Sequence, residues 1–591
     1  MRFLPAAVIV LLIPSGIAAH PASQASIDDF FRDFTADWMR HDPSFATATR
    51  YFTGDEQDRL ERPLTPQTLA WKRDRMQRAK RGLVELSEFD RAQMNDTQRV
   101  SADLLQWQLK DDVEEGQFLD YEFPLSQLGD NVYLVSTLTV VHPLRTDRDA
   151  ENYVAALGQV STRMDELIAE SKRLAAKGVL PPRFILQAAI KQMQTFILPP
   201  PGENAFVGAF ARKMEAIKTM PEAKREELRA QAEKIVATQV YPAWQRASTL
   251  LQSQLPHATQ DAGLWRLKGG SNAYAYFIHS DTTTNLTPEQ IHEIGLKRVG
   301  EIEAQMDGLL RQLGRTEGSV KDRIEKLQAD LQYPDPTSDA SRTQIMQDIE
   351  GILRDGERRS ALPFDIRPKS PVIAQPYPRF LEDASAASYS APAPDGSRPG
   401  TFQYPLRLSQ MTKFGLRSVV YHEAVPGHHF QIALQVENAA LPRFRQIGAF
   451  GRNGAYVEGW GLYAERLAAE SGWYDGDPEG LLGQLNYELF RARRLVVDTG
   501  LHAMHWTQQQ AIDYGIEPSE VERYVVWPGQ ACSYMVGELK IIELREKAKR
   551  TLGDKFSLRE FHNAILRPGD VSFDVLERQV DAYIKSAGGT P

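Results

Sequence analysis

The chain contains 591 residues, of which 42% are hydrophobic and 25% are charged, and its formal net charge is -9. These values are typical of a soluble globular protein that is long enough to bury a large core. Because the charge is acidic and no stripe of Lys and Arg with interleaved aromatic residues occurs, we do not expect a nucleic-acid partner.

The N-terminus has the pattern of a secretory signal peptide. Arg2 precedes the short apolar run from Leu4 to Ile13, and small residues follow as far as Ala19. The pattern predicts that residues 1–19 are removed and that the mature protein is secreted or periplasmic. The run is shorter than the roughly 20 residues that span a bilayer, so no stable membrane insertion is expected after cleavage. The chain has a single cysteine, Cys532, so no internal disulfide is possible. Because no cysteine lies near the cleavage site, we expect no lipid anchor.

Three helices are predicted in the first part of the mature chain. Apolar residues recur there with the 3.6-residue period of an α-helix. In the second of these helices, Thr65 and Pro66 suit a cap and a first turn. Their aromatic residues are expected to lie in the core. The segments are 27–38, 65–86 and 96–112.

Helical periodicity returns after a β-branched patch, 132–137, which we interpret as a loop or a short strand. The later helical segments are 150–177, 183–196, 222–252 with an interruption near Tyr241-Pro242, and 287–313. No linker divides the chain. We therefore predict a mainly α fold in a single domain over residues 25–585.

The composition changes between residues 357 and 405, which are rich in Pro, Ser and Ala. A strand at 388–392, a turn and a partner strand at 402–404 are predicted there. An edge strand at this place could pair with an extended peptide through main-chain hydrogen bonds, whereas a plain connecting loop is the alternative interpretation.

The stretch that begins at His422-Glu423 and ends at His428-His429 has the residues of a metal site. In the HExxH motif of zinc peptidases, two histidines one helical turn apart bind zinc and the glutamate activates a water molecule. Here the second histidine comes late, and an unbroken helix could not bring both imidazoles to one small ion. Since Pro426 and Gly427 disrupt helices, we predict that one helix stops near Glu423 and another starts near His428.

A third ligand is predicted about thirty residues downstream, in the stretch from Tyr456 to Glu465. A carboxylate among apolar and aromatic residues is costly unless a cation pairs with it. Glu458 is therefore the candidate ligand, and Glu465 could steady a ligating imidazole.

These two motifs resemble the bacterial domain-of-unknown-function family 885, which is grouped with the gluzincin metallopeptidases. The resemblance covers nearly the whole mature chain. It implies an elongated, cleft-bearing helical fold in one or two lobes, like that of the oligopeptidases and angiotensin-converting enzyme, with zinc as cofactor. It also implies that His422, His428 and Glu458 are the ligands. Because the spacing departs from HExxH, His429 remains the alternative to His428.

Two later stretches, residues 491–506 and 528–540, also match the family. A peptidase of this kind needs a donor for the oxyanion that forms at the carbonyl, and a Tyr hydroxyl or a cationic His suits that task. Tyr534 is the candidate, with His502 in reserve. Tyr534 could instead be a core tyrosine, and His502 could instead belong to a buried ion-pair ladder along its helix.

The sequence thus predicts an exported zinc peptidase of short peptides, in which Glu423 takes a proton from water and passes it to the leaving amine. One alternative is a zinc hydrolase of a non-peptide amide. Another is a non-catalytic peptide-binding protein of the cell envelope. The sequence leaves the oligomeric state and the choice between exo- and endopeptidase open.

Overall fold

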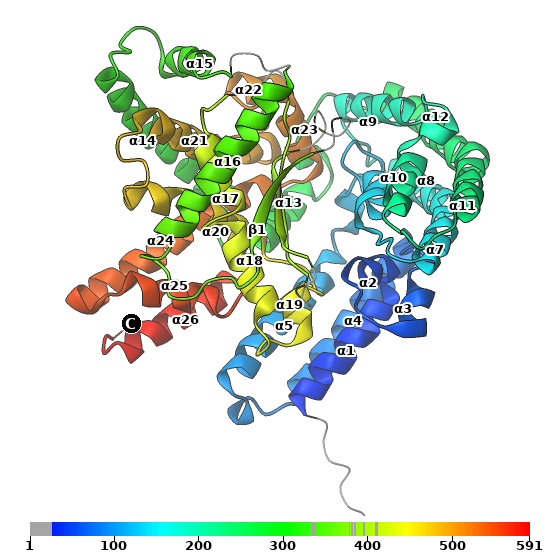
Figure 1. Ribbon diagram of the computed structural model, residues 1–591, viewed down its shortest axis with the longest axis horizontal. Coiled ribbons are helices and arrows are strands. Elements are labelled where there is room, and N and C mark those ends of the chain that lie inside the picture. The colour runs from blue at the N-terminus through cyan, green and yellow to red at the C-terminus, as the bar shows by residue number, and fades with distance from the viewer. Residues whose placement is uncertain are drawn as a thin grey trace, which may run out of the picture.

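The computed structural model describes residues 26–333, 338–377, 379, 382, 386–393, 396, 398–407 and 412–590. Within these ranges the protein is mostly helical, with one three-stranded sheet (Figure 1). The mainly α prediction with a small β element is therefore confirmed. The predicted signal peptide, residues 1–19, lies outside the described residues. Among the described helices none combines the length and the apolar character that crossing a membrane requires.

The N-terminal helices follow the predicted periodicity. The Ser26 hydroxyl caps the first helix by accepting a hydrogen bond from the Asp29 amide. The second predicted helix begins later than expected, because the hydroxyl that accepts from a first-turn amide is that of Thr68 and not that of Thr65. The elements are α1 (Ile27–His41), α2 (Pro43–Thr49), α3 (Gly54–Leu60), α4 (Leu69–Ser87), α5 (Asp96–Glu115) and α6 (Asp130–Ser136).

The β-branched patch at 132–137 is helical, so both interpretations of it, a loop and a strand, were wrong. Helix α6 continues into a π-helical turn, η3 (Thr137–Val141). Leu134 and Leu138, four residues apart, are both buried in one core cluster. Burial of this helical face outweighs the β propensity of the neighbouring residues, since tertiary packing routinely overrides local preference.

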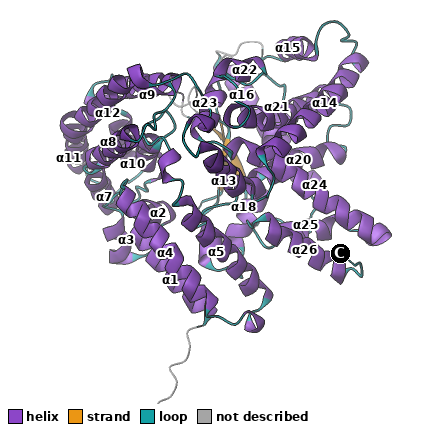
Figure 2. Cartoon of the chain, turned by 180° about the vertical axis from the view of Figure 1, so that it is seen from behind, coloured by secondary structure: helices purple, strands orange, loops and turns teal. Residues whose placement is uncertain are grey.

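A second group of helices has a hydrophobic core largely of its own. Figures 1 and 2 show this group gathered at one side of the molecule. The interruption predicted near Tyr241 is confirmed as the π-helical turn η5 (Val236–Val240). The helices are α7 (Asp147–Leu157), α8 (Val160–Ala176), α9 (Arg183–Phe196), α10 (Ala205–Glu215), α11 (Glu222–Ile235) and α12 (Tyr241–Gln254).

The remaining helices carry the two motifs, and of these α16 packs against β1 (Val372–Pro376) and α18 against β2 (Ser388–Ser390). Among them α14 packs along α21 and α20 packs along α24. They are α13 (Gly270–Thr282), α14 (Pro288–Gln312), α15 (Val320–Asp330), α16 (Asp339–Arg359), α17 (Leu416–Glu423), α18 (His428–Glu437), α19 (Arg443–Ile447), α20 (Gly454–Glu470), α21 (Pro478–His502), α22 (Gln508–Asp513), α23 (Pro518–Val526), α24 (Ser533–Leu552), α25 (Leu558–Leu566) and α26 (Phe573–Ser586).

The sheet contains β1 (Val372–Pro376), β2 (Ser388–Ser390) and β3 (Gly400–Tyr404) in the order β1-β3-β2. Strand β2 pairs with β3 in antiparallel register, with Tyr389 opposite Phe402, which confirms the predicted pairing. Strand β1 pairs with β3 in parallel, a contact that the sequence did not reveal. Part of the predicted turn between β2 and β3 falls on residues that are not described. Among the described strands, β2 keeps one edge unpaired.

Helix α20 is held close to α24 by glycines. A Cβ atom on Gly459 would lie 2.4 Å from the carbonyl carbon of Gly537, so no larger residue fits at this crossing. Gly459 directly follows Glu458. The close crossing thus fixes the height and rotation of α20 where it carries the candidate third ligand.

Candidate metal centre

The helix break predicted at Pro426-Gly427 is confirmed. Helix α17 ends at Glu423 and α18 begins at His428. A Cβ atom on Gly427 would lie 1.8 Å from the carbonyl oxygen of His422, so only glycine lets the chain fold back here. The Trp460 indole N–H donates to the carbonyls of Pro426 at 3.0 Å and Gly427 at 3.2 Å, and thereby ties the break to α20.

Two imidazoles and one carboxylate converge at this break. Glu458 Oε2 lies 3.4 Å from His422 Nε2 and 3.5 Å from His428 Nε2. A tetrahedral zinc ion with bonds of about 2.0–2.2 Å places neighbouring ligand atoms about 3.3–3.5 Å apart. Both separations from Glu458 therefore match those around one tetrahedral ion, and a donor set of two imidazole nitrogens and one carboxylate oxygen suits zinc.

His422 is oriented by groups on both sides of its ring. Its Nδ1 lies 2.8 Å from Glu465 Oε1, and the Ser418 hydroxyl donates to the other oxygen of that carboxylate. Nδ1–H pointing at Glu465 leaves Nε2 as the ring nitrogen that faces Glu458, and this nitrogen can bind a metal ion in place of a proton. Beneath the ring lies Gly461, where a Cβ atom would be 2.6 Å from His422 Cε1.

The two adjacent histidines of α18 point to different neighbours. His428 faces Glu458, and the Gln431 amide nitrogen lies 2.9 Å from its Nδ1. His429 instead turns to the sheet, where its Nδ1 is 2.9 Å from the Tyr389 hydroxyl, and burial lowers its pKa to about 4. The structure thus places His428, and not His429, beside the other two candidate ligands.

Glu423 is the carboxylate that remains beside the imidazoles. One of its oxygens lies within 4.8 Å of ligand nitrogens of both His422 and His428. Burial raises its pKa above the ordinary value, although the two nearby imidazoles oppose that shift. A carboxylate whose pKa is raised towards neutrality is a suitable proton acceptor. Its neighbour Glu458 makes the shorter contacts to both rings and is the better ligand.

The electrostatics of the three candidate ligands are mutually dependent. Burial alone would lower the pKa of His422, but the hydrogen bonds to Glu458 and Glu465 outweigh it and raise that pKa to about 10. Burial alone would raise the pKa of Glu458, yet the bonds to His422 and His428 hold it well below its ordinary value. Positive charge at this point is therefore favoured, whether from protons or from a cation.

The two candidate oxyanion donors have different surroundings. Tyr534 lies in the first turn of α24, is partly exposed, and packs against the Arg494 guanidinium, whose carbon is 4.3 Å from the ring centre. His502 is fully buried, and both of its ring nitrogens are engaged by main-chain groups. Its Nδ1 accepts from the Leu264 amide at 3.1 Å, and its Nε2–H donates to the Tyr524 carbonyl at 3.0 Å. His502 has no ring nitrogen left for a substrate.

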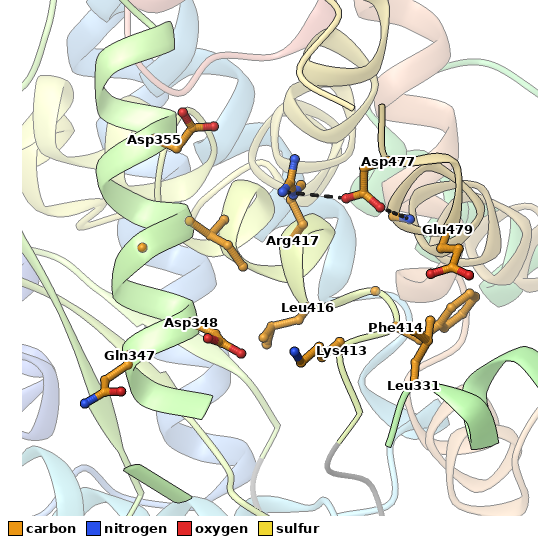
Figure 3. A pocket seen from close by; sticks show the side chains of 14 residues that line it. Leu331, Gln347, Asp348, Asp355, Lys413, Phe414, Leu416, Arg417, Asp477 and Glu479 are labelled. Atoms are coloured by element: carbon orange, nitrogen blue, oxygen red, sulfur yellow. Dashed lines mark hydrogen bonds and ion pairs between the residues drawn. The ribbon is translucent and has the colours of Figure 1, made fainter. Parts of the chain in front are cut away.

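Figure 3 shows a separate cavity of about 480 Å³ beside α16 and the first turn of α17. Its walls include Asp348, Lys413 and Glu479, as well as an ion pair in which Arg417 lies 3.6 Å from Asp477. None of the candidate ligands lines it. The cavity is therefore distinct from the metal centre.

Several residues that position the site were not predicted from the sequence. Trp460 and Gly461 lie inside the second motif, and Ser418 and Gln431 flank the first. Their proximity to the motifs was the available signal, but which atoms they contact depends on how α20 packs on α17 and α18.

Comparisons with known proteins agree with the fold. The chain matches the family described as "Bacterial protein of unknown function (DUF885)" over residues 43–580. A crystal structure from Colwellia psychrerythraea has a TM-score of 0.89 and 32% identity, covering 95% of this chain and 99% of that one. A structure from Shewanella oneidensis has a TM-score of 0.69 and 18% identity, covering 94% and 99%, and indicates a shared fold alone. Both carry the description "putative lipoprotein", the second also "of unknown function". No match was found among curated proteins.

Proposed function

The chain belongs to the bacterial DUF885 family, and we propose that it acts as an exported, zinc-dependent peptidase that hydrolyses short peptides. The observation that carries this proposal is the convergence of His422 Nε2, His428 Nε2 and Glu458 Oε2, with Glu423 beside them as a carboxylate that is not needed as a ligand. This is the minimum set for metal-assisted hydrolysis, because three protein ligands leave a fourth position open.

Each residue has a distinct task in the proposed reaction. A zinc ion held by His422, His428 and Glu458 would act as a Lewis acid towards water and a carbonyl group. Glu423 takes the proton of the attacking water and delivers it to the nitrogen of the leaving amine, for which its raised pKa is suited. The Tyr534 hydroxyl donates a hydrogen bond to the developing oxyanion. Glu465 keeps His422 in the tautomer that presents Nε2.

An extended peptide is the substrate that the surroundings of the site favour. Strand β2 has an unpaired edge among the described residues, and its central residue, Tyr389, contacts His429, the neighbour of His428. Such an edge can bind an extended main chain through a ladder of hydrogen bonds. The side chain of His422 is 5% exposed and that of His428 9% exposed, so a narrow, unfolded chain can reach them more readily than a folded protein.

Metal analysis of the purified protein combined with digestion of a peptide library tests this proposal. We expect about one zinc ion per chain and cleavage that a chelator abolishes and added zinc restores. A parallel panel of acylated amino acids distinguishes a peptidase from a hydrolase of other amides. A protein that binds no metal, or that binds zinc and cleaves no peptide, would contradict the proposal.

A further inference from the structure

A second cavity, of about 520 Å³, lies against the outer face of α13, and we refer to it as the α13 cavity. Its walls come from four parts of the chain. These are α4, residues 121–133 leading into the start of α6, α13 itself, and residues 526–530 at the link between α23 and α24. Two large aromatic side chains line it while remaining exposed, Tyr133 at 47% and Trp527 at 44%. Exposed aromatic rings at a concave surface are typical of ligand sites.

The charges in the α13 cavity do not balance. Lys72 is its only cationic lining residue, and it forms an ion pair with Glu122. The carboxyl groups of two further lining residues, Asp130 and Asp281, form no hydrogen bond or close ion pair with the residues that the structure describes, although the charge of Lys72 acts to lower the pKa of Asp130. Burial and the nearby carboxylates of Asp498 and Asp111 raise the pKa of Asp281 to about 8. The carboxyl group of Asp281 is therefore largely protonated near pH 7 while the cavity is empty, and a cation that entered the cavity would displace this proton.

The α13 cavity lies next to the helix that carries the third candidate ligand. The carbonyl oxygen of Asp281 would be 3.6 Å from a Cβ atom on Gly454, the first residue of α20. Glu458 follows Gly454 by one helical turn, a rise of about 6 Å. Gln530 also lines the cavity, and α24, which carries Tyr534, begins three residues later. Walls of the α13 cavity therefore adjoin the two helices that carry Glu458 and Tyr534.

We propose that the α13 cavity is a substrate subsite that binds a cationic group, an ammonium or a guanidinium, of the peptide. The surplus carboxylates of Asp130 and Asp281 neutralise the cation, and the rings of Tyr133 and Trp527 provide faces against which it can pack. This inference rests on the proposed function for its substrate class. The cation has two possible sources in a peptide, namely a Lys or Arg side chain and the free amino terminus.

Binding of short peptides to the full-length Glu423→Gln variant tests the subsite without requiring hydrolysis. The probes are alanine hexapeptides that carry one Lys, their counterparts with uncharged norleucine, and N-acetylated forms of both, measured by calorimetry. We expect the charged peptides to bind about tenfold more tightly than the uncharged ones, as for a partly desolvated ion pair. Weaker binding of the acetylated peptides than of their free counterparts assigns the cation to the amino terminus, and weaker binding of the norleucine peptides than of the Lys peptides assigns it to the side chain.

Asp281→Asn and Asp130→Asn, each made in the Glu423→Gln background, should reduce that preference to less than about threefold. The matched control is Glu479→Gln, which removes a carboxylate from the other cavity and should leave the preference intact. Equal binding of all four peptides by the parent protein, or an unchanged preference in both Asn variants, would overturn the subsite. If wild-type protein cleaves peptides without charge preference, only the subsite fails. If it cleaves none but the Glu423→Gln protein binds cationic peptides through these carboxylates, only the peptidase proposal fails.

Discussion

Gly461 lies directly beneath the imidazole of His422, so closely that a Cβ atom would be 2.6 Å from Cε1 of the ring. The neighbouring Trp460 ties the Pro426-Gly427 break to the same helix through its indole N–H. Helix α20 therefore does more than supply Glu458. It also contacts the His422 ring and the Pro426-Gly427 break, and so positions the first motif.

Substitution Gly461→Ala should displace the His422 ring and weaken zinc binding by about 10–100-fold, the range seen when support of a ligating histidine is lost. Zinc titration against a competing chelator measures this. Gly300→Ala is the control, since it also adds a methyl group within a helix but meets no atom within 4 Å. Equal zinc affinity in the Gly461→Ala and Gly300→Ala proteins would show that the contact does not position the ligand.

The adjacent histidines of α18 should differ sharply when each is changed to Gln. His428→Gln removes a predicted ligand and should reduce bound zinc to below about a tenth of the wild-type amount under dilute conditions. His429→Gln removes the contact with Tyr389 but no candidate ligand, and should retain zinc. Metal content after dialysis is the measurement. The reverse pattern would assign the ligand to His429.

Glu423→Gln should keep zinc and lose about 10²–10⁴-fold in the rate of peptide hydrolysis, because an amide cannot accept the proton of the attacking water. Metal analysis and peptide cleavage are measured on the same preparation. Glu479→Gln, remote from the centre, provides the control for loss of one carboxylate. Hydrolysis at the native rate by the Glu423→Gln protein would end the proposed mechanism.

Glu465→Gln should act through His422 and not on the substrate. The amide can no longer accept from both Nδ1 of His422 and the Ser418 hydroxyl as a carboxylate does, so zinc affinity should fall about 10–100-fold. At saturating zinc, however, most of the peptidase activity should return, as expected for a positioning residue. Activity that stays low at every zinc concentration would instead assign Glu465 a direct role in the reaction.

The structure predicts that His502 stabilises the fold in a pH-dependent manner. Burial lowers its pKa to about 4, despite the hydrogen bond to the Tyr524 carbonyl, whereas an unfolded histidine has a pKa near 6.5. Between those values the unfolded chain binds a proton that the folded chain excludes. Stability from this residue is therefore complete above about pH 6.5 and is lost as the pH falls towards 4, by up to about 1.4 kcal/mol per pH unit.

Chemical denaturation of the wild type and of His502→Gln between pH 4 and pH 7 measures this effect. The variant should be less stable at pH 7 but should show a shallower loss on acidification. Its peptide hydrolysis at pH 7, corrected for the folded fraction, should be close to that of the wild type. Parallel stability curves for the two proteins would contradict the assigned role of His502.

The helical class and the position of the helix break were predictable because both depend on local chemistry. The period of the apolar residues defines α1 and α5. Helix α17 ends before Pro426-Gly427, because Pro426 has no amide N–H to donate and Gly427 is conformationally free. The residue types of the candidate metal centre were likewise evident, because carboxylates that cluster with imidazoles in an apolar stretch are costly to bury unless positive charge balances them.

Other features depend on contacts between residues far apart in the chain, and these only the tertiary structure decided. Spacing alone could not choose between His428 and His429, because that choice follows from where Glu458 lies once α20 packs on α24 through Gly459. The helical state of 132–137 follows from burial of Leu134 and Leu138 in a core that other helices complete. The sequence determined which chemistry was available and where the chain turns, whereas packing determined which atoms meet, because distances of a few ångströms between distant segments have no local signature.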